Sequence, residues 1–112
     1  MASPNPGEAR LADLGLAAKT RPVVIVSRRD LDPPRMTVLY VPLTTQSRGS
    51  LYEVPIPRLG FLERESVANV QGLGSIPHVR LERRLGVLPQ DVMRDIQRAL
   101  AFALDLNQFP AL

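Results

Sequence analysis

The sequence predicts a mainly β domain that ends in one α-helix. Short alternating or β-branched runs recur between residues 8 and 83, and the apolar pattern changes to a helical period only after residue 89. Strands and helices do not alternate along the chain, which argues against a parallel sheet. A chain of 112 residues suffices for one modest core. We therefore expect a single small antiparallel sheet or barrel, with the helix across it or over its open edge.

The chain begins with a segment that carries few structural signals. Residues 1–6 include two prolines and small polar side chains, and we expect them to form a flexible leader. Residues 8–14 alternate as a first strand, although their alanines and leucines also suit a helix. Gly15 then opens a short connection that ends at Thr20.

Two clearer strands follow this connection. The β-branched run at residues 23–27 predicts a buried, central strand. Residues 28–35 are charged and contain prolines, which is typical of a surface loop, and residues 36–41 predict the next strand. Pro42 should end that strand or place it at a sheet edge, because proline has no N–H for the ladder.

Three shorter strands complete the predicted sheet. Residues 51–54 form the first, which should close at Pro55. Residues 66–71 form the second and end at two nearby glycines. Residues 79–83 alternate as a last strand with one wet face.

The C-terminal segment has the period of an amphipathic helix. Apolar side chains share one face of it, at Val92, Ile96, Ala99 and Ala103. Pro89 suits the first helical turn, and Asp91 places a negative charge near the positive end of the helix dipole. We expect this face to pack on the sheet.

Composition excludes several classes of function. The chain has no cysteine and only one histidine, so we expect no disulfide, no metal site and no cofactor. No run approaches the roughly 20 apolar residues of a membrane span, and the first residues lack the order of a secretion signal. We therefore expect a cytoplasmic protein that works without a metal or a membrane.

The positive charge is carried almost entirely by arginine. The net charge is +3, and Lys19 is the only lysine among the 14 cationic residues. Arginine can grip a phosphate with two hydrogen bonds, which fits a polyanionic partner. Codon bias in a GC-rich genome is an alternative explanation and, by itself, the stronger one.

Three local segments carry a family resemblance. They read Arg-Pro-Val-Val-Ile-Val-Ser at residues 21–27, Val-Pro-Leu-Thr-Thr-Gln-Ser-Arg-Gly at residues 41–49 and Glu-Ser-Val-Ala-Asn-Val-Gln at residues 65–71. In sequence and order they resemble the MazF/PemK family of bacterial toxins. With the opening Gly-Glu and the final helix, the resemblance covers residues 7–106 and predicts one toxin domain followed by a tail at residues 107–112.

The resemblance implies both a fold and an activity. The fold is the SH3-like small barrel of the MazF/PemK/CcdB toxins, assembled as a homodimer. The activity is metal-independent cleavage of single-stranded RNA at short sequences, which leaves a cyclic phosphate and a free 5′-hydroxyl. The implied partner is a small antitoxin, expected to be acidic-tailed, whose tail occupies the RNA groove.

Matched by position, Arg21 is similar to the family's catalytic arginine and Thr44 to its catalytic threonine. Thr45, Ser66, Gln71 and Lys19 are the expected substrate-binding residues. Attack by the RNA's own 2′-hydroxyl creates a phosphorane with extra negative charge, which a guanidinium and a hydroxyl can stabilise. The protein therefore needs no nucleophile of its own.

The general base is harder to assign. Arginine is a poor proton acceptor at neutral pH because its pKa lies above about 12. Arg21 is therefore expected to act through electrostatic stabilisation and assistance to the leaving group. Glu8, Lys19 and His78 are possible auxiliaries.

Structural explanations compete at each of these positions. Arg21 can be a surface arginine before a strand, and the Thr44–Thr45 pair can reflect β propensity. Gln71 and Ser66 can serve the backbone at strand ends. The connection at residues 15–20 is also shorter than the loop that closes over RNA in several relatives, so their cleavage preference does not transfer and activity could be weakened.

Two other functions fit the same predicted fold. One is a non-catalytic, CcdB-like toxin that binds DNA gyrase. The other is an inactive homologue that only binds the antitoxin. Fold alone does not separate these from a ribonuclease.

Overall fold

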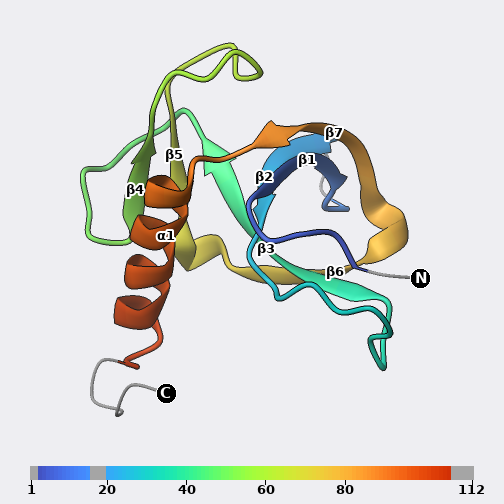
Figure 1. Ribbon diagram of the computed structural model, residues 1–112. Coiled ribbons are helices and arrows are strands. Elements are labelled where there is room, and N and C mark those ends of the chain that lie inside the picture. Colours follow the sequence, from blue (N-terminus) through green and yellow to red (C-terminus); the bar gives the residue numbers. More distant parts are fainter. Residues whose placement is uncertain (1–2, 16–19, 107–112) are drawn as a thin grey trace.

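The computed structural model describes residues 3–15 and 20–106 (Figure 1). In these residues the strands precede a single α-helix, as the sequence predicts. The elements are β1 (Glu8–Asp13), β2 (Thr20–Ile25), β3 (Thr37–Thr44), β4 (Glu53–Ile56), β5 (Ser66–Asn69), the 3-10 turn η1 (Val70–Gly72), β6 (Gly74–Pro77), the 3-10 turn η2 (His78–Arg80), β7 (Leu81–Val87) and α1 (Gln90–Ala103).

All strand pairs are antiparallel, and β3 is the centre of the sheet. The order is β4-β5-β3-β2-β1-β7, with β6 paired to β3 off this path. β3 has β2 on one side, while its first half pairs with β6 and its last residues pair with β5. The expectation of a mainly β fold with a C-terminal helix is confirmed.

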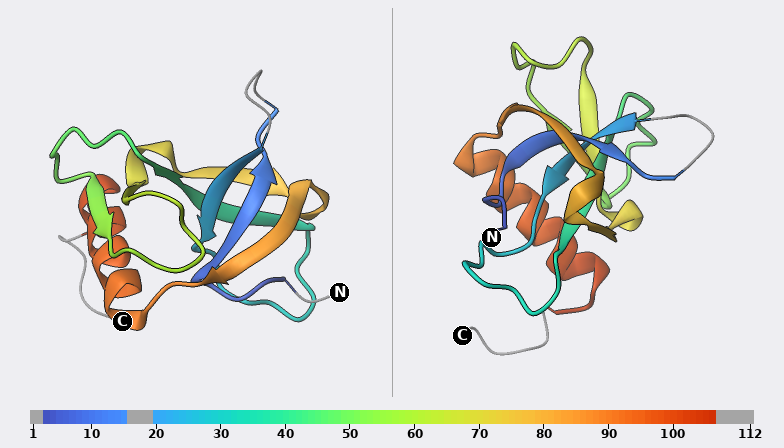
Figure 2. Two further views of the ribbon diagram at one scale, coloured as in Figure 1. Left: turned by 90° about the horizontal axis from the view of Figure 1, so that it is seen from above. Right: turned by 90° about the vertical axis from the view of Figure 1, so that its right-hand side faces the viewer.

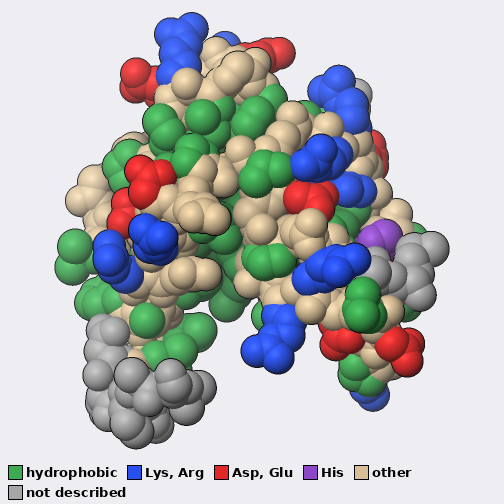
Figure 3. All heavy atoms as spheres, in the orientation of Figure 1, with side chains coloured by type: hydrophobic (Ala, Val, Ile, Leu, Met, Phe, Trp, Pro, Cys, Tyr) green, Lys and Arg blue, Asp and Glu red, His purple; other side chains and the backbone are tan. Residues whose placement is uncertain are grey.

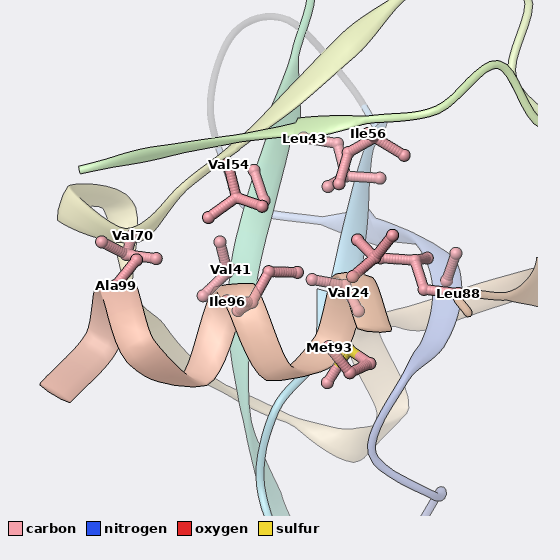
Figure 4. Close-up of a cluster of buried hydrophobic side chains, with 13 residues drawn as sticks. Val24, Val41, Leu43, Val54, Ile56, Val70, Leu88, Met93, Ile96 and Ala99 are labelled. Carbon is pink, nitrogen blue, oxygen red and sulfur yellow. The ribbon is translucent and has the colours of Figure 1, made fainter. Parts of the chain in front are cut away.

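The helix α1 closes one hydrophobic core against β4 and η1. Ile96 and Ala99 point from the helix toward Val41, Val54 and Val70, and Met93 belongs to the same core (Figure 4). Ile96 is fully buried, and the predicted apolar face is therefore the packed face. No helix in the described part of the chain is long and apolar enough to cross a membrane.

A second core lies within the curl formed by β6, β3, β2, β1 and β7, away from the helix (Figure 2, left). Its buried members are Ala12, Val23, Ile25, Val38 and Ile76. Side chains alternate between the faces of a strand, so Val23 and Ile25 face this core while Val24 faces the core under α1. The run expected to form a central buried strand is confirmed in β2.

Two prolines stand inside strands that they were expected to end. β3 continues past Pro42 to Thr44, and Pro42 falls where β3 leaves β6 and begins to pair with β5. Such a break in the ladder accommodates a residue without an N–H. Pro55 pairs with Val67 within β4, which lies at the end of the strand order, where proline is tolerated.

The strand pattern after residue 66 also differs from the expectation. Residues 66–71 divide into β5 and the turn η1, and the last strand begins at Leu81 and extends to Val87. The strand β6, whose Gly74 pairs with Tyr40, was not predicted from the sequence. A Cβ at Gly74 would come within 2.6 Å of the Tyr40 hydroxyl, so close packing requires the glycine that made this strand look like a turn.

The start of the chain contacts the loop after β2. The Ser3 hydroxyl accepts a hydrogen bond from the Asp30 N–H at 2.6 Å, and the Ser3 N–H donates to the Asp30 carbonyl at 2.8 Å. Ser3 is buried, so it is anchored although it lies in the predicted leader. Flexibility of the leader as a whole stays a prediction.

Candidate active site

A hollow of about 570 Å³ opens where β2 and β3 separate. Four of the predicted site residues line it: Arg21, Thr44, Thr45 and Ser66. They come from three segments of the chain, at β2, the end of β3 and the start of β5, each more than twenty residues from the next. Lys19 and the greater part of the short connection lie outside the described residues.

The strand register explains why Arg21 and Thr44 line the same hollow. Val23 is paired with Pro42, and continuing that antiparallel register by two residues sets Arg21 across from Thr44. Both side chains then lie on the face of the second core, because Arg21 alternates with Val23 and Thr44 with Tyr40. Arg21 is exposed, so its guanidinium is accessible at the mouth of the hollow.

The Thr44 hydroxyl is oriented by the backbone. Its Oγ1 accepts a hydrogen bond from the Gln46 N–H at 3.1 Å. A hydroxyl that accepts in this way keeps its own proton to donate. Thr44 can therefore donate to an oxyanion beside Arg21.

The Ser66 hydroxyl has the opposite character. It donates to the Arg64 carbonyl at 3.2 Å, so its lone pairs remain for accepting. This arrangement suits an N–H group of a nucleobase better than a phosphate oxygen.

Gln71 lies in a neighbouring hollow of about 300 Å³, which shares Pro42, Thr44 and Gln46 with the first. Its N–H donates to Asn69 Oδ1 at 3.1 Å, which caps η1 and fixes the start of this turn. The structure thus brings Gln71 to the other side of Thr44. Together the two hollows form a candidate groove with Thr44 in its middle.

Glu53 adds a fixed negative charge to the second hollow. Hydrogen bonds from the N–H groups of Ser50 and Arg48 hold the pKa of this carboxyl below its ordinary value. The donor–acceptor distances are 2.9 Å from Ser50 and 3.0 Å from Arg48. Glu53 could not be predicted from the sequence, because its hydrogen bonds run to backbone groups that no side-chain motif reveals.

Two proposed auxiliaries lie elsewhere. Glu8 accepts from Arg10 Nη1 at 3.3 Å and lies 3.6 Å from Arg84 Nε, on the strands β1 and β7. His78 opens the turn η2. Neither residue lines the two hollows, so the structure does not place them at the candidate groove.

Several lining residues were not predicted from the sequence. Gln46 and Tyr40 line the first hollow, and Arg48 and Asn69 line the second. Gln46 and Arg48 lie within the matched segment at residues 41–49, which is the signal that could have identified them. No group of three or more potential metal-ligating side chains occurs among the described residues.

The surface charge is mixed rather than of one sign. On the face that carries α1 and β7, positive and negative side chains alternate with hydrophobic ones (Figure 3). With a net charge of only +3, a polyanion must be held by specific groups more than by a general field. The exposed guanidinium of Arg21, inside a hollow, is such a group.

The fold and this groove define a class of small antiparallel β domains with a C-terminal helix and a polar groove, and comparison with known proteins identifies the family. A sequence profile described as PemK-like, MazF-like toxin of type II toxin-antitoxin system matches residues 5–104. The chain therefore belongs to the PemK/MazF toxin family, and the resemblance found in its sequence is confirmed.

Individual relatives agree with this assignment. The chain is similar to Endoribonuclease MazF3 of Mycobacterium tuberculosis, with 33% identity over 89 residues, which cover 80% of this chain and 86% of that protein. The structure of Mycobacterium tuberculosis toxin MazF-mt6 superposes with a TM-score of 0.77 at 31% identity, covering 88% of this chain and 96% of that one. The structure of an endoribonuclease in complex with its cognate antitoxin from Mycobacterial species superposes with a TM-score of 0.81 at 25% identity. The match covers 98% of this chain and 100% of that one.

Proposed function

We propose that this chain is the toxin of a type II toxin–antitoxin system and acts as a sequence-specific endoribonuclease on single-stranded messenger RNA. The observation that carries the proposal is that Arg21 and Thr44 line one hollow in a chain of the PemK/MazF family. Similar proteins named endoribonucleases support the activity. Residues 7–106 would form the toxin domain, and residues 107–112 a tail.

The reaction needs no nucleophile from the protein. The 2′-oxygen attacks the adjacent phosphorus, the bond from phosphorus to the 5′-oxygen breaks, and a 2′,3′-cyclic phosphate forms. The 2′-hydroxyl loses its proton and the departing 5′-oxygen gains one. Arg21 stabilises the charge that develops on the phosphorane oxygens, and Thr44 donates a further hydrogen bond.

The remaining groove residues would bind the RNA chain. Ser66 offers a hydrogen-bond acceptor to a base. Gln71 would bind the RNA in the second hollow, which adjoins the first at Thr44. Thr45 lines the hollow beside the reacting phosphate. We assign Lys19, by its position in the sequence, to a phosphate near Arg21.

The proposed partners follow from the family. We propose that two copies of the chain form a homodimer and that a small, acidic-tailed antitoxin covers the groove. The solved complex of a related endoribonuclease with its cognate antitoxin supports this partner. A messenger RNA substrate places the proposed activity in the cytoplasm.

Incubation of the purified protein with several long RNAs in excess EDTA tests the proposal. We expect cleavage at a short recurring sequence, with 5′-hydroxyl and cyclic-phosphate ends. Arg21→Ala should slow cleavage by about 10²–10³-fold, the typical effect of removing a donor to a developing oxyanion. Intact RNA in every sequence context, or full activity of Arg21→Ala, would contradict the proposal.

The same assay identifies the alternatives. RNA binding without turnover would indicate an inactive homologue that serves only the antitoxin. Inhibition of DNA gyrase without RNA cleavage would indicate a CcdB-like toxin.

A further inference from the structure

The loop between β3 and β4 is held in place by a carboxylate. Both Glu53 side-chain oxygens lie 3.0 Å from the backbone nitrogen of Arg48, and Oε1 also accepts from the Ser50 N–H at 2.9 Å. The Glu53 N–H in turn donates to the Ser50 carbonyl at 3.2 Å. The Glu53 side chain therefore ties two backbone N–H groups of the loop to the start of β4, and the Glu53 N–H ties a third group, the Ser50 carbonyl.

The other end of the loop is tied to Thr44. The Gln46 N–H donates to Thr44 Oγ1, as described above. Gly49, between the two residues whose N–H groups Glu53 accepts, has a φ of 65°, which a glycine adopts without strain. The loop thus runs from the proposed catalytic threonine to Glu53 with a side-chain anchor at each end.

Several residues of this loop line the candidate groove. Gln46 lines both hollows, while Arg48 and Ser50 line the second one together with Glu53. Arg48 and Gln46 are exposed, so a substrate in the groove can reach them. Their positions depend on a backbone that the sheet does not hold, because the loop lies between strands.

Glu53 itself has little capacity left to contact a substrate. A carboxylate offers about four lone-pair sites, and the two loop N–H groups approach both of its oxygens. Its chemistry is that of an anchor.

We propose that Glu53 is a positioning residue, which fixes the loop at residues 45–50 so that Gln46 and Arg48 present a preformed wall to single-stranded RNA. This inference rests on the proposed function. A loop fixed before binding loses less conformational freedom when the substrate arrives, so the benefit appears in binding. Because Glu53 does not touch the scissile phosphate, its loss should raise KM and leave kcat nearly unchanged.

Glu53→Gln is the direct test, since the carboxamide keeps the size but has one acceptor oxygen and no charge. Glu82→Gln, an exposed glutamate on β7, is the matched control. We expect KM to rise roughly tenfold in Glu53→Gln, with kcat within about twofold and no change in the control. Glu53→Asp should recover part of the loss, because the charge is retained.

The effect of Glu53→Gln in a variant that already lacks the Gln46 and Arg48 side chains separates loop positioning from a general loss of stability. When Gln46 and Arg48 are both changed to alanine, the wall is absent and Glu53→Gln should raise KM less than about twofold. A tenfold rise in that background as well, an unchanged KM in the native background, or a fall in kcat at constant KM would overturn the proposal.

Amide hydrogen exchange provides a measurement that does not depend on RNA cleavage. Exchange of the Arg48 and Ser50 amides should accelerate at least tenfold in Glu53→Gln, while buried amides such as Ile96 keep their protection. Unchanged protection of both loop amides would overturn the anchoring role even if the enzyme is active. Faster exchange in a protein that cleaves no RNA would instead preserve the anchor and refute the proposed function.

Discussion

The hydrogen bonds of the Thr44 and Ser66 hydroxyls determine which of them can donate to a substrate and which can accept from it. The Thr44 hydroxyl accepts from the backbone and can donate, whereas the Ser66 hydroxyl donates to the backbone and can accept. Two hydroxyls in one hollow are thereby assigned to different parts of a nucleotide. The sequence supplied the residue types, but only the local geometry shows the direction of each hydrogen bond.

Glu8 is a structural residue by the same reasoning. Its side chain is 13% exposed and pairs with Arg10, whose side chain is 20% exposed. Glu8→Gln should lower the free energy of unfolding by about 1–3 kcal/mol, because Arg10 loses a charged partner. Urea unfolding measures this effect.

The matched control for Glu8 is Glu82→Gln on the exposed surface of β7, which should change the stability by less than about 0.5 kcal/mol. Cleavage by folded Glu8→Gln should match the unsubstituted protein. A large loss of kcat at unchanged stability would restore Glu8 as a catalytic auxiliary.

At the scale of elements, β3 determines the site. One strand pairs with β6, β2 and β5 in succession, and the Arg21–Thr44 hollow opens where β2 and β3 part. Pro42 stands at this transition, which explains why a residue that usually ends strands is retained within one. The site therefore forms because β3 changes its pairing from β6 to β5 at this point.

Gly74 of β6 tests the link between strand packing and the hollow. Its Cβ-less backbone lies under the Tyr40 ring, and an added Cβ would come 2.6–2.8 Å from three Tyr40 side-chain atoms. Gly74→Ala should therefore displace a ring that lines the hollow, raise KM and cost about 1–3 kcal/mol of stability.

Gly60→Ala is the control for Gly74→Ala, because no atom lies within 4 Å of a Cβ built there. Steady-state cleavage and thermal unfolding, measured on both variants, report the two effects. Equal behaviour of the two variants would show that Tyr40 is not held by the glycine.

The same elements show how far the sequence could predict this fold. Periodicity identified the helix face and the buried run in β2, because local burial patterns carry that information. It missed β6, whose glycine is required by Tyr40 more than thirty residues away, and it ended β3 and β4 at prolines that their positions in the sheet tolerate. Such contacts depend on register between distant segments, which no local pattern contains.

The candidate site divides in a similar way. Arg21, Thr44, Thr45 and Ser66 were predicted through the family resemblance, and the structure brings them together. Gln71 lies in the adjoining hollow, while Glu8 and His78 lie outside both. Glu53 could not be predicted, because its partners are backbone N–H groups of a loop whose path is known only from the fold.

For the whole molecule, a modest net charge predicts a modest salt dependence of RNA binding. The logarithm of affinity for single strands falls with the logarithm of salt concentration by about 0.7 per neutralised phosphate. A 2′-O-methyl RNA cannot supply the nucleophile, so its binding can be measured without cleavage. Arg21→Ala should make the slope shallower by about 0.7.

Arg98→Ala is the control for this slope. Arg98 lies on α1, pairs with Asp95 at 3.2 Å and lines neither hollow. Its loss should leave the slope unchanged. Equal slopes for Arg21→Ala and the unsubstituted protein would mean that Arg21 does not contact a phosphate.

A double-mutant cycle of Arg21→Ala and Thr44→Val, read as single-turnover RNA cleavage, tests most directly whether the two side chains act on one phosphate. Each change should slow cleavage by about 10²–10³-fold, and the double variant should lose much less than the product of the two. Thr37→Val, at the exposed start of β3, should have no effect. Losses that multiply fully, or a single variant that cleaves at the unsubstituted rate, would contradict the account.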